Sequence, residues 1–587
     1  MFCLIDLIIE KCKLAVNAVY PELAEVNIEV TSTSHAKFGH YQLNSAMRFA
    51  KILGKPPKVI AENILIKLRD NNSKENIFSD LSIAGAGFIN FTLASDFLEK
   101  NIELFLKYGK FSWEKESPGS NNIPKEEKVI IDFSSPNIAK EMHVGHLRST
   151  IIGDSLARIF EFLNYKVLRI NHIGDWGTQF GMLIYYLKIN DKLSEPLTPA
   201  YLVEYYKQAK VLFDTDADFK KAAQKEVVAL QSGDQNSLII WKNICEISAQ
   251  SYKEIYQLLD IKIIDRGESF YNNMLKQVLD DFTEKKLLQE SNGAKCVYLP
   301  GFINKEQQPL PLIIQKSDGG YNYATTDLAA IKYRVQKDHG DWLIYVTDSG
   351  QSLHFSMVFT AAKQVGYLQD NVTKVSHVPF GLVLRNDGKK FKTREGETEK
   401  LKDLINNAIL KAKKLILERD QNIETEELEK LSHVLGINAI KYADLSNNRN
   451  SDYVFDYDKM LQFTGNTAAF LSYAYVRINS IKNKISINVD ELINSNTKIQ
   501  LIESYEKDLA IKICKFQDTI KAAIVDLMPN RLTDYLYLLA EEFHAFFHHC
   551  RVEGTQFQNS RILLCEAVLR ILRTGFNLLG LQLVDRM

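Results

Sequence analysis

One stretch constrains the fold more than any other, because it combines a buried strand, a turn and a helix start. Residues 128–133 read Lys-Val-Ile-Ile-Asp-Phe, a short apolar and β-branched run that predicts a buried strand. Residues 134–136, Ser-Ser-Pro, then indicate a turn. Further on, apolar side chains recur at the spacing of one helix face, at Ile152, Leu156, Ile159 and Leu163. This stretch therefore predicts the strand–turn–helix unit of an α/β fold.

The sequence His143-Val-Gly-His146 falls where that helix is expected to begin. The first turn of a helix has free backbone N–H groups and the positive end of the helix dipole, and both favour an anion. Gly145 has no Cβ, so a phosphate or a flat ring can approach the backbone closely. The two imidazoles can donate hydrogen bonds to charge that develops on a phosphate. The alternative is that both histidines only cap the helix and bond locally.

The longer run around these histidines resembles a known family. Residues 134–149, Ser-Ser-Pro-Asn-Ile-Ala-Lys-Glu-Met-His-Val-Gly-His-Leu-Arg-Ser, closely resemble the signature of class I aminoacyl-tRNA synthetases, specifically the arginyl-tRNA synthetases. Residues 171–181 follow a second predicted strand at Lys166–Ile170 and resemble the same family. The resemblance extends over essentially the whole chain. It implies an arginine–tRNA ligase that makes arginyl-adenylate from L-arginine and ATP and transfers arginine to the 3′ end of tRNA(Arg).

Composition limits the other possibilities. The net charge of −1 gives no overall basic field, which counts only weakly against a nucleic-acid partner. Seven cysteines without a C-x-x-C pair suggest neither a structural metal nor a disulfide framework, and they fit a reducing cytoplasm. No apolar run is long enough to cross a membrane, and Asp6 and Glu10 interrupt the apolar N-terminus, so no signal peptide is expected. We expect a cytoplasmic monomer without a membrane partner.

A chain of 587 residues should form three or four domains, and four regions are expected here. The first, 1–118, is an α+β N-terminal domain. The second, 119–396, is the catalytic domain. A helical linker over 397–455 and an all-α anticodon-binding domain over 456–587 complete the chain, by resemblance to the family. In the N-terminal domain we expect a helix over 1–18 and strands at Val26–Thr31 and Ala84–Thr92.

The catalytic domain is expected to have a Rossmann-like, doubly wound parallel sheet with a helical insertion at about 195–295. After the insertion, the sheet should resume at Leu310–Gln315 and continue at Trp342–Thr347. A helix should open within residues 320–328, between these strands. Ligands of such sheets bind at the carboxyl ends of the strands.

A basic run follows the turn signal Asn386-Asp-Gly388. Such a run is normally a solvated loop. Here it resembles the second class I signature loop, which closes over the ATP phosphates in the family. Thr393 stands where that pattern has its second lysine, a common departure in arginyl-tRNA synthetases, and a lysine before the first histidine is thought to substitute. The resemblance thus implies a catalytic set of Lys140, His143, His146, Lys390 and Lys392. It also implies contacts with ATP, bound as its Mg²⁺ complex, by His143, Gly145, His146, His354, Lys392 and Arg394.

Arginine as a substrate adds a demand for acidic partners, because its guanidinium presents five fixed donors. Glu268 and Asp327 suit this role, and Tyr323 lies one helical turn before Asp327 on the same face. The alternative for Asp327 is a carboxylate in an ordinary salt bridge on the side of a helix. By resemblance, Asp132, Asn137 and Gln351 would hold the backbone groups of the amino acid.

The resemblance also implies tRNA contacts in both terminal regions, by Gln42, Asn44, Tyr473, Arg477 and Met587. An Asn or Gln at the start of a helix more often caps that helix or faces solvent than binds a base. An aromatic residue more often packs in a core. Two other functions stay open. A nucleotidylyltransferase shares the H-x-G-H fold but gives no reason for the long helical C-terminal region. An inactive tRNA-binding paralogue would not need intact His143, His146, Asp327 and Gln351.

Overall fold

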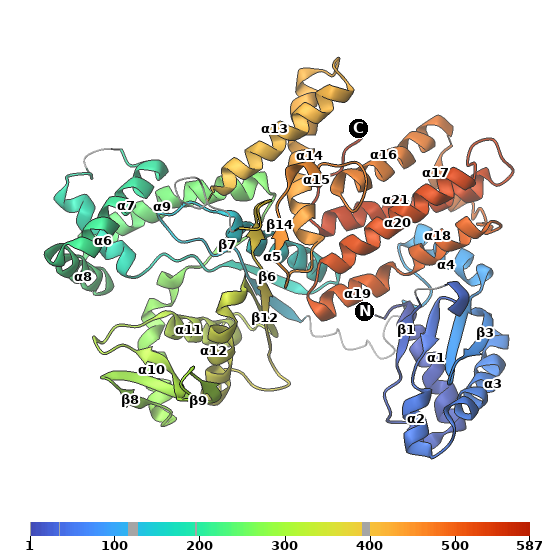
Figure 1. The fold of residues 1–587 in the computed structure, drawn as a ribbon, viewed down its shortest axis with the longest axis horizontal. Helices are drawn as coiled ribbons and strands as arrows, with labels where there is room; N and C mark the ends of the chain where they lie inside the picture. Colours follow the sequence, from blue (N-terminus) through green and yellow to red (C-terminus); the bar gives the residue numbers. More distant parts are fainter. Residues whose placement is uncertain (1, 34–35, 115–126, 194–195, 390–398, 486) are drawn as a thin grey trace. The chain divides into compact units, whose positions relative to one another are not determined.

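The chain divides into two compact units, which we describe separately: residues 1–123, 462–577 and 582–587 form the first, and residues 124–461 with 578–581 the second. The structure is a computed structural model that describes residues 2–33, 36–114, 127–193, 196–389, 399–485 and 487–587 (Figure 1). Within these ranges no helix has the length and apolar character needed to cross a membrane.

The N-terminal part of the first unit is an α+β structure, as predicted. Its antiparallel sheet has the order β1 (Val30–Ser32), β2 (Tyr41–Leu43), β4 (Phe88–Leu93) and β3 (Phe78–Ala84). Its helices are α1 (Leu4–Val19), η1 (Pro21–Leu23), η2 (Ala36–Phe38), α2 (Ala46–Leu53), α3 (Pro57–Glu75) and α4 (Ser95–Tyr108).

Two predicted strands of this region need correction. The strand expected at Ala84–Thr92 is a hairpin, because Ala84 ends β3 and β4 begins at Phe88. Gly85 and Gly87 form the turn with φ of 55° and 125°, a backbone conformation that favours glycine. The strand expected from Val26 begins only at Val30.

The rest of the first unit is helical, as predicted for the C-terminal region. Its helices are α16 (Ala468–Ile485), α17 (Val489–Asn494), α18 (Ser504–Cys514), α19 (Phe516–Asp526), α20 (Asn530–His549) and α21 (Gln558–Leu578). Helices α20 and α21 approach so closely that a Cβ on Gly575 would lie 2.5 Å from the Leu536 side chain. Within the unit, Tyr41 of β2 donates to Asp518 of α19 at 2.7 Å, which ties the sheet to the helices.

The second unit contains the predicted parallel sheet. The strand order is β12 (Lys374–Phe380), β11 (Trp342–Asp348), β5 (Lys128–Asp132), β6 (Lys166–Asn171) and β7 (Ile264–Asp265), all parallel. The chain moves outward from β5 through β6 to β7, and then returns to the other side of β5 for β11. The carboxyl ends of β5 and β11 are therefore the switch point at which doubly wound sheets bind ligands.

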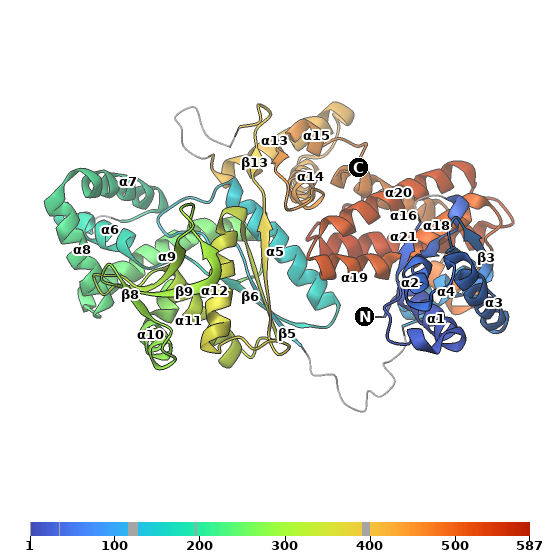
Figure 2. The same ribbon diagram turned by 60° about the horizontal axis from the view of Figure 1, so that its bottom comes forward.

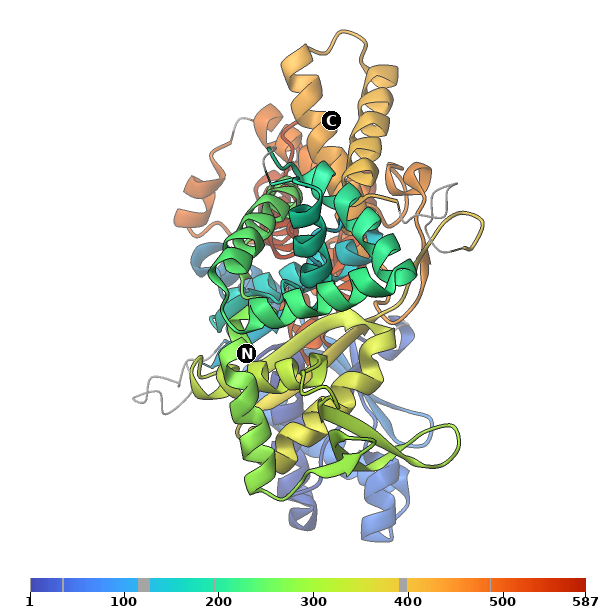
Figure 3. The same cartoon turned by 90° about the vertical axis from the view of Figure 1, so that its left-hand side faces the viewer.

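The prediction that Leu310–Gln315 continues this sheet is wrong. Strand β10 (Pro309–Gln315) belongs to a separate antiparallel sheet with β9 (Ala294–Ile303) and β8 (Gln289–Ser291). The insertion predicted at about 195–295 is largely helical, as expected, with α7 (Pro199–Thr215), α8 (Ala217–Gln231) and α9 (Gln235–Leu258), and α6 (Thr178–Ile189) precedes it. These helices pack on one another and form one cluster, coloured teal to green in Figure 3.

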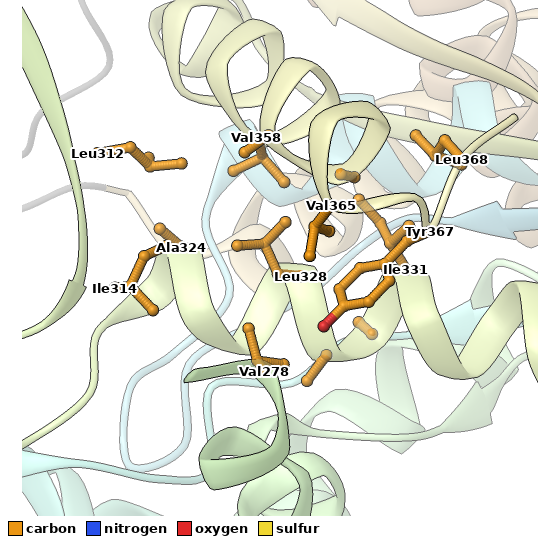
Figure 4. Close-up of a cluster of buried hydrophobic side chains, with 14 of the residues drawn as sticks. Val278, Leu312, Ile314, Ala324, Leu328, Ile331, Val358, Val365, Tyr367 and Leu368 are labelled. Carbon is orange, nitrogen blue, oxygen red and sulfur yellow. The ribbon is translucent and has the colours of Figure 1, made fainter. Parts of the chain in front are cut away.

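A large apolar core joins three helices of the second unit to strand β10. It packs α10 (Leu275–Glu284), α11 (Tyr323–Gln336) and α12 (Ser352–Val365) against β10 through buried side chains such as Val278, Ile314, Leu328 and Val358 (Figure 4). The predicted helix at 320–328 is thus the start of α11. Because Leu328 and Ile331 point into this core, the orientation of α11 is fixed.

The second unit contains further helices and strands besides these. They are α5 (Val144–Phe162), η3 (Glu268–Met274), η4 (Ser349–Gln351), β13 (Val383–Leu384), α13 (Leu401–Arg419), α14 (Thr425–Leu445), β14 (Tyr453–Val454) and α15 (Tyr457–Met460). Helices α13 and α14 lie side by side (Figures 1 and 2). A Cβ on Gly436 of α14 would lie 2.7 Å from Cα of Ile409 in α13, so the close contact requires glycine.

Candidate active site

A cavity of about 430 Å³ opens at the carboxyl ends of β5 and β11, at the switch point of the sheet. Its walls come from the turn after β5, the start of α5, the end of β11 and the segment that follows β12. Among the residues that line it are Asn137, His143, Gly145, His146, Gln351 and Gly381. The cavity therefore brings together several residues that the sequence singled out: the histidines of the H-x-G-H pattern, Gly145, Asn137 and Gln351.

The two histidines are held by the backbone of the helix start. His143 is the N-cap residue of α5, and its Nδ1 accepts a hydrogen bond from the Gly145 N–H at 3.1 Å. The His143 N–H donates in turn to Nδ1 of His146 at 3.1 Å. A Cβ at position 145 would lie 2.9 Å from Cε1 of His143, so glycine is needed there. The predicted helix thus begins at Val144, within the H-x-G-H pattern, and the histidines take part in its cap.

These hydrogen bonds also determine which ring nitrogen of each histidine carries the proton and can donate a hydrogen bond. Burial lowers the pKa of His143, and the charge of Lys140 lowers it further. Burial, with the charge of His143, lowers the pKa of His146 to about 3. Both imidazoles are therefore neutral at neutral pH, and since each Nδ1 accepts a hydrogen bond, each proton is on Nε2. The pair presents two neutral N–H donors.

The turn between β5 and α5 has an unusual backbone that buried hydroxyls support. Ser134 and Ser135 have φ of 73° and 51°, which is uncommon for residues with a side chain. The Ser134 N–H donates to Oγ of Ser149 at 2.9 Å, and Ser149 donates to the Val346 carbonyl at 2.6 Å. Oγ of Ser134 also lies 2.7 Å from the hydroxyl of Tyr256. This network joins the ends of β5 and β11 to α5 and α9, and so keeps the cavity floor in place.

A second group of site residues, Glu268, Asp327 and Asp175, forms an acidic cluster, which we call the acidic pocket. Burial raises the pKa of Glu268 to about 8, and the charges of Asp175 and Asp327 contribute to the rise. Asp175 accepts hydrogen bonds from the N–H and the hydroxyl of Ser269, at 2.8 and 2.6 Å. The predicted partners Glu268 and Asp327 are thus brought together, and Asp175 joins them. Tyr323 is 71% exposed, yet partial loss of solvent together with the charge of Glu268 raises its pKa.

Two predicted residues of this region have partners within the protein. His354 binds Asp327, with 2.6 Å between Nε2 and Oδ2. Asp132 forms an ion pair with the buried Arg334, with 2.7 Å between Oδ2 and Nη2, and its other oxygen accepts from Ser135 at 3.2 Å. The guanidinium of Arg334 also lies over the ring of Tyr345. Asp132 is therefore a neutralised carboxylate at the end of β5.

The other predicted catalytic residues differ in how much the structure says of them. Lys140 is exposed, and its ammonium lies 5.4 Å from the ring centre of Tyr206 in α7. Gln351 ends η4 and donates to Asp348 at 3.1 Å. Lys390, Lys392 and Arg394 lie outside the residues that the structure describes.

The residues predicted to contact tRNA lie in the first unit. Gln42 in β2 donates to Asn90 at 2.7 Å, and Asn44 donates to Thr31 at 3.0 Å. Gln42 is therefore in a strand, and neither residue caps a helix. Arg477 of α16 stacks on the half-exposed ring of Tyr473, with 4.6 Å between guanidinium carbon and ring centre. Met587 is the partly buried last residue.

Three further residues of the site were not identified from the sequence. Asp175 and Arg148 lie inside the two motifs that carried the resemblance, so the motifs contained them without indicating a role. Arg334 lies at the end of α11, and nothing in its local pattern distinguishes it from a surface arginine. The role of such residues becomes clear only from the residues that they contact, which come from distant parts of the chain.

Family models cover most of the chain. The model for the catalytic domain of class I tRNA synthetases (R) matches residues 114–457. The model for the DALR anticodon binding domain matches residues 471–587, and that for the arginyl tRNA synthetase N-terminal domain matches residues 4–93.

Curated relatives and solved structures agree with these matches. The chain is 54% identical over 565 residues to an arginine–tRNA ligase of Protochlamydia amoebophila, covering 95% of this chain and 94% of the relative. It is 49% identical to that of Chlamydia felis, with 98% of each chain covered. The crystal structure of the Plasmodium falciparum arginyl-tRNA synthetase superposes with a TM-score of 0.87 at 35% identity, covering 100% of both chains. The Thermus thermophilus enzyme, at 20% identity and a TM-score of 0.78, shares the fold over 100% of both chains. With a histidine pair at the switch point of its sheet and these relatives along its whole length, the chain belongs to the arginyl-tRNA synthetase family of class I.

Proposed function

We propose that this chain ligates L-arginine to tRNA(Arg) in two steps, with the cavity at β5 and β11 as the site of ATP-dependent activation. In the first step, the carboxylate of arginine attacks the α-phosphate of ATP and pyrophosphate leaves. The protein contributes mainly positioning and charge stabilisation to such a transfer. The observation that carries this proposal is the pair of neutral Nε2–H donors that line the cavity beside the N-terminus of α5.

The arginine side chain would bind in the acidic pocket. Its guanidinium can replace the proton of Glu268 and pair with Asp327, while Tyr323 covers the pocket from the first turn of α11. Asn137 and Gln351, which line the cavity, would hold the backbone groups of arginine. Asp132 would act through its ion pair with Arg334, since both of its oxygens already have partners.

The phosphates would be held by the two histidines, the Gly145 backbone and a set of cations. Lys140 lies close enough to both histidines for its charge to lower their pKa values. We assign Lys390, Lys392 and Arg394 to the same task on sequence grounds. ATP would enter as its Mg²⁺ complex. His354, which the resemblance implies as an ATP contact, would instead orient Asp327 through their hydrogen bond.

The remaining regions would bind tRNA. We assign residues 1–118 and 456–587 to tRNA recognition, with Gln42, Asn44, Tyr473, Arg477 and Met587 as contacts. Residues 119–396 would form the catalytic domain, and residues 397–455 the linker. Because the histidine pair and the acidic pocket come from one chain, a monomer would suffice, acting in the cytoplasm.

ATP–pyrophosphate exchange tests the activation step. The protein is assayed with arginine, citrulline and lysine, each with and without tRNA(Arg). Arginine should support exchange once tRNA is present, as the family resemblance implies. Citrulline keeps the shape but not the charge, so it should fail, because the carboxylates would be left without a cation. Exchange with citrulline at the rate of arginine would contradict the pocket, and brisk exchange without tRNA would favour a nucleotidylyltransferase-like site.

A further inference from the structure

Arg148 is a fully buried cation two residues after His146. Its side chain and that of Asp444, its ion-pair partner in α14, both have 0% exposure. A buried charge is tolerated only when it is paired and hydrogen-bonded, because removing it from water is costly. The partners of Arg148 therefore show which segments of the chain this part of α5 keeps in position.

Those partners come from three distant parts of the chain. Nε of Arg148 lies 3.2 Å from the carboxylate of Asp444. One Nη donates to the Gly381 carbonyl at 2.8 Å and to the Ser451 carbonyl at 3.0 Å. The guanidinium also contacts the rings of Phe380 and Tyr453, at 5.7 and 5.1 Å from the ring centres. These contacts use the planar fork of arginine, which a lysine does not have.

The segment that Arg148 holds is a wall of the cavity. Residues 380–383 run from the end of β12 to the start of β13, and they line the cavity together with the histidines. Gly381 also donates to the Arg449 carbonyl at 2.8 Å, and Leu382 donates to Asp452 at 2.6 Å. A Cβ on Gly381 would lie 2.6 Å from this segment, so there is no space for the wall to move that way. The wall is thus fixed to residues 449–455, both directly and through Arg148, which binds both segments.

We propose that Arg148 is a positioning residue for the nucleotide, which sets the distance between the histidine pair and the cavity wall 380–383. The inference rests on the proposed ATP site. Arg148 does not belong to the acidic pocket proposed for the arginine side chain, which is built from Asp175, η3, α11 and the start of α12. Its loss should therefore affect ATP selectively.

The test compares Arg148→Lys with a matched control, Arg158→Lys. Arg158 lies on the same helix, pairs with Asp154 at 2.7 Å, and is not among the residues that line the cavity. Aminoacylation kinetics are measured for each substrate in turn, together with the melting temperature. A displaced wall should lower kcat/KM for ATP by roughly 10²-fold, the effect of a misplacement of about 1 Å. The KM values for arginine and tRNA should stay within about twofold of the wild type.

Asp444→Asn is a second variant. It removes the charge that pairs with the Arg148 guanidinium and changes no residue that lines the cavity. It should give the same ATP-selective loss to a smaller degree. The double variant should be no worse than Arg148→Lys, since both changes act on one pair. In Arg158→Lys, all three substrates should behave as in the wild type.

Two results would overturn the proposal. One is a normal kcat/KM for ATP in Arg148→Lys. The other is an equal loss toward ATP, arginine and tRNA that follows the drop in melting temperature, because this is what a purely stabilising ion pair gives. If Arg148→Lys does not fold, Asp444→Asn is judged by the same criterion, and if neither folds the pair is a folding determinant and the proposal is wrong. A wild-type protein that fails to charge arginine would instead refute the proposed function itself.

Discussion

Nε2 of His354 lies 2.6 Å from Oδ2 of Asp327, which connects the first turn of α12 to α11 at the acidic pocket. Burial disfavours a charge on His354, but its hydrogen bond to Asp327 and the charge of that carboxylate raise its pKa above the usual range. The neighbouring Glu268 has a pKa raised to about 8. A guanidinium that binds both carboxylates must therefore displace a proton from Glu268 and compete with His354 for Asp327.

The first prediction concerns the pH dependence of arginine binding. Below a pH of about 8 Glu268 is protonated in the free protein, and above it the carboxylate is charged. A guanidinium favours the charged form, so binding at lower pH must first remove the proton, which costs about 1.4 kcal/mol per unit. Arginine affinity should rise by up to about tenfold per pH unit and level off above a pH of about 8. Calorimetry across this range, in buffers of different ionisation enthalpy, measures both affinity and proton release.

Glu268→Gln provides the matched variant for that measurement. It keeps the shape of the side chain but cannot ionise, so its arginine affinity should be lower above a pH of about 8 and flatter below it. Equal pH slopes in the two proteins would show that another group titrates on binding.

The second prediction concerns Asp327. Truncating a buried partner of a charge pair costs about 2–5 kcal/mol, so Asp327→Ala should raise the KM for arginine strongly or abolish charging. The affinity for tRNA should not change. His354→Gln keeps the carboxylate and removes only its internal partner, so its effect on the arginine KM should be much smaller. Normal arginine kinetics in Asp327→Ala would rule out its place in the pocket.

The third prediction concerns Lys140, whose ammonium lies beside Tyr206 and close to the histidines. Thr393 stands where the family pattern has a lysine, and Lys140 can supply the missing charge. If that charge acts mainly in the transition state, Lys140→Ala should lower kcat by roughly 10²–10³-fold, as for one preorganised donor. The KM values for arginine and tRNA should remain near the wild type.

The variants Lys392→Ala and Lys140→Ala/Lys392→Ala are measured beside it. An unchanged kcat in Lys140→Ala would mean that the charge comes from elsewhere, with Lys392 or Arg394 as the candidates. A solvated lysine would change the rate by less than about twofold.

The fourth prediction concerns Arg477, which stacks on Tyr473 in α16. If it contacts a phosphate, Arg477→Ala should weaken tRNA binding and reduce the slope of log K against log salt concentration by about one. Arginine and ATP kinetics at saturating tRNA should not change. Tyr473→Phe keeps the ring and removes the hydroxyl that Arg477 contacts, which separates stacking from hydrogen bonding. A salt slope identical to that of the wild type would exclude the phosphate contact.

The sequence predicted best what local patterns determine. The strand at 128–133, the turn and the helix after it appear as β5 and α5, because the apolar periodicity and the turn residues act within a short span. The prediction was wrong where the pairing of a strand depends on residues far away in the sequence. The apolar pattern of β10 fits a strand of either sheet. Its pairing with β9 determines that it belongs to the antiparallel sheet.

The same limit applies to the site. His143, His146, Glu268 and Asp327 were singled out by the family resemblance and by the chemistry of phosphate and guanidinium, and the structure brings each pair together. The residues that pair with the site residues or shift their pKa values could not be predicted. The ion pair of Asp132 with Arg334 and the contribution of Asp175 to the pKa of Glu268 arise from segments far apart in sequence. Their residue types alone are equally typical of a protein surface.

Charging of tRNA with each of the twenty amino acids tests the central claim most directly. The full chain is incubated with bulk tRNA, Mg²⁺ and ATP, and the attached amino acid is identified after hydrolysis. The account predicts that arginine alone is attached, that ATP is required, and that the Asp327→Ala variant attaches little or none. Attachment of a different amino acid, or no attachment of arginine by a folded wild-type protein, would contradict it.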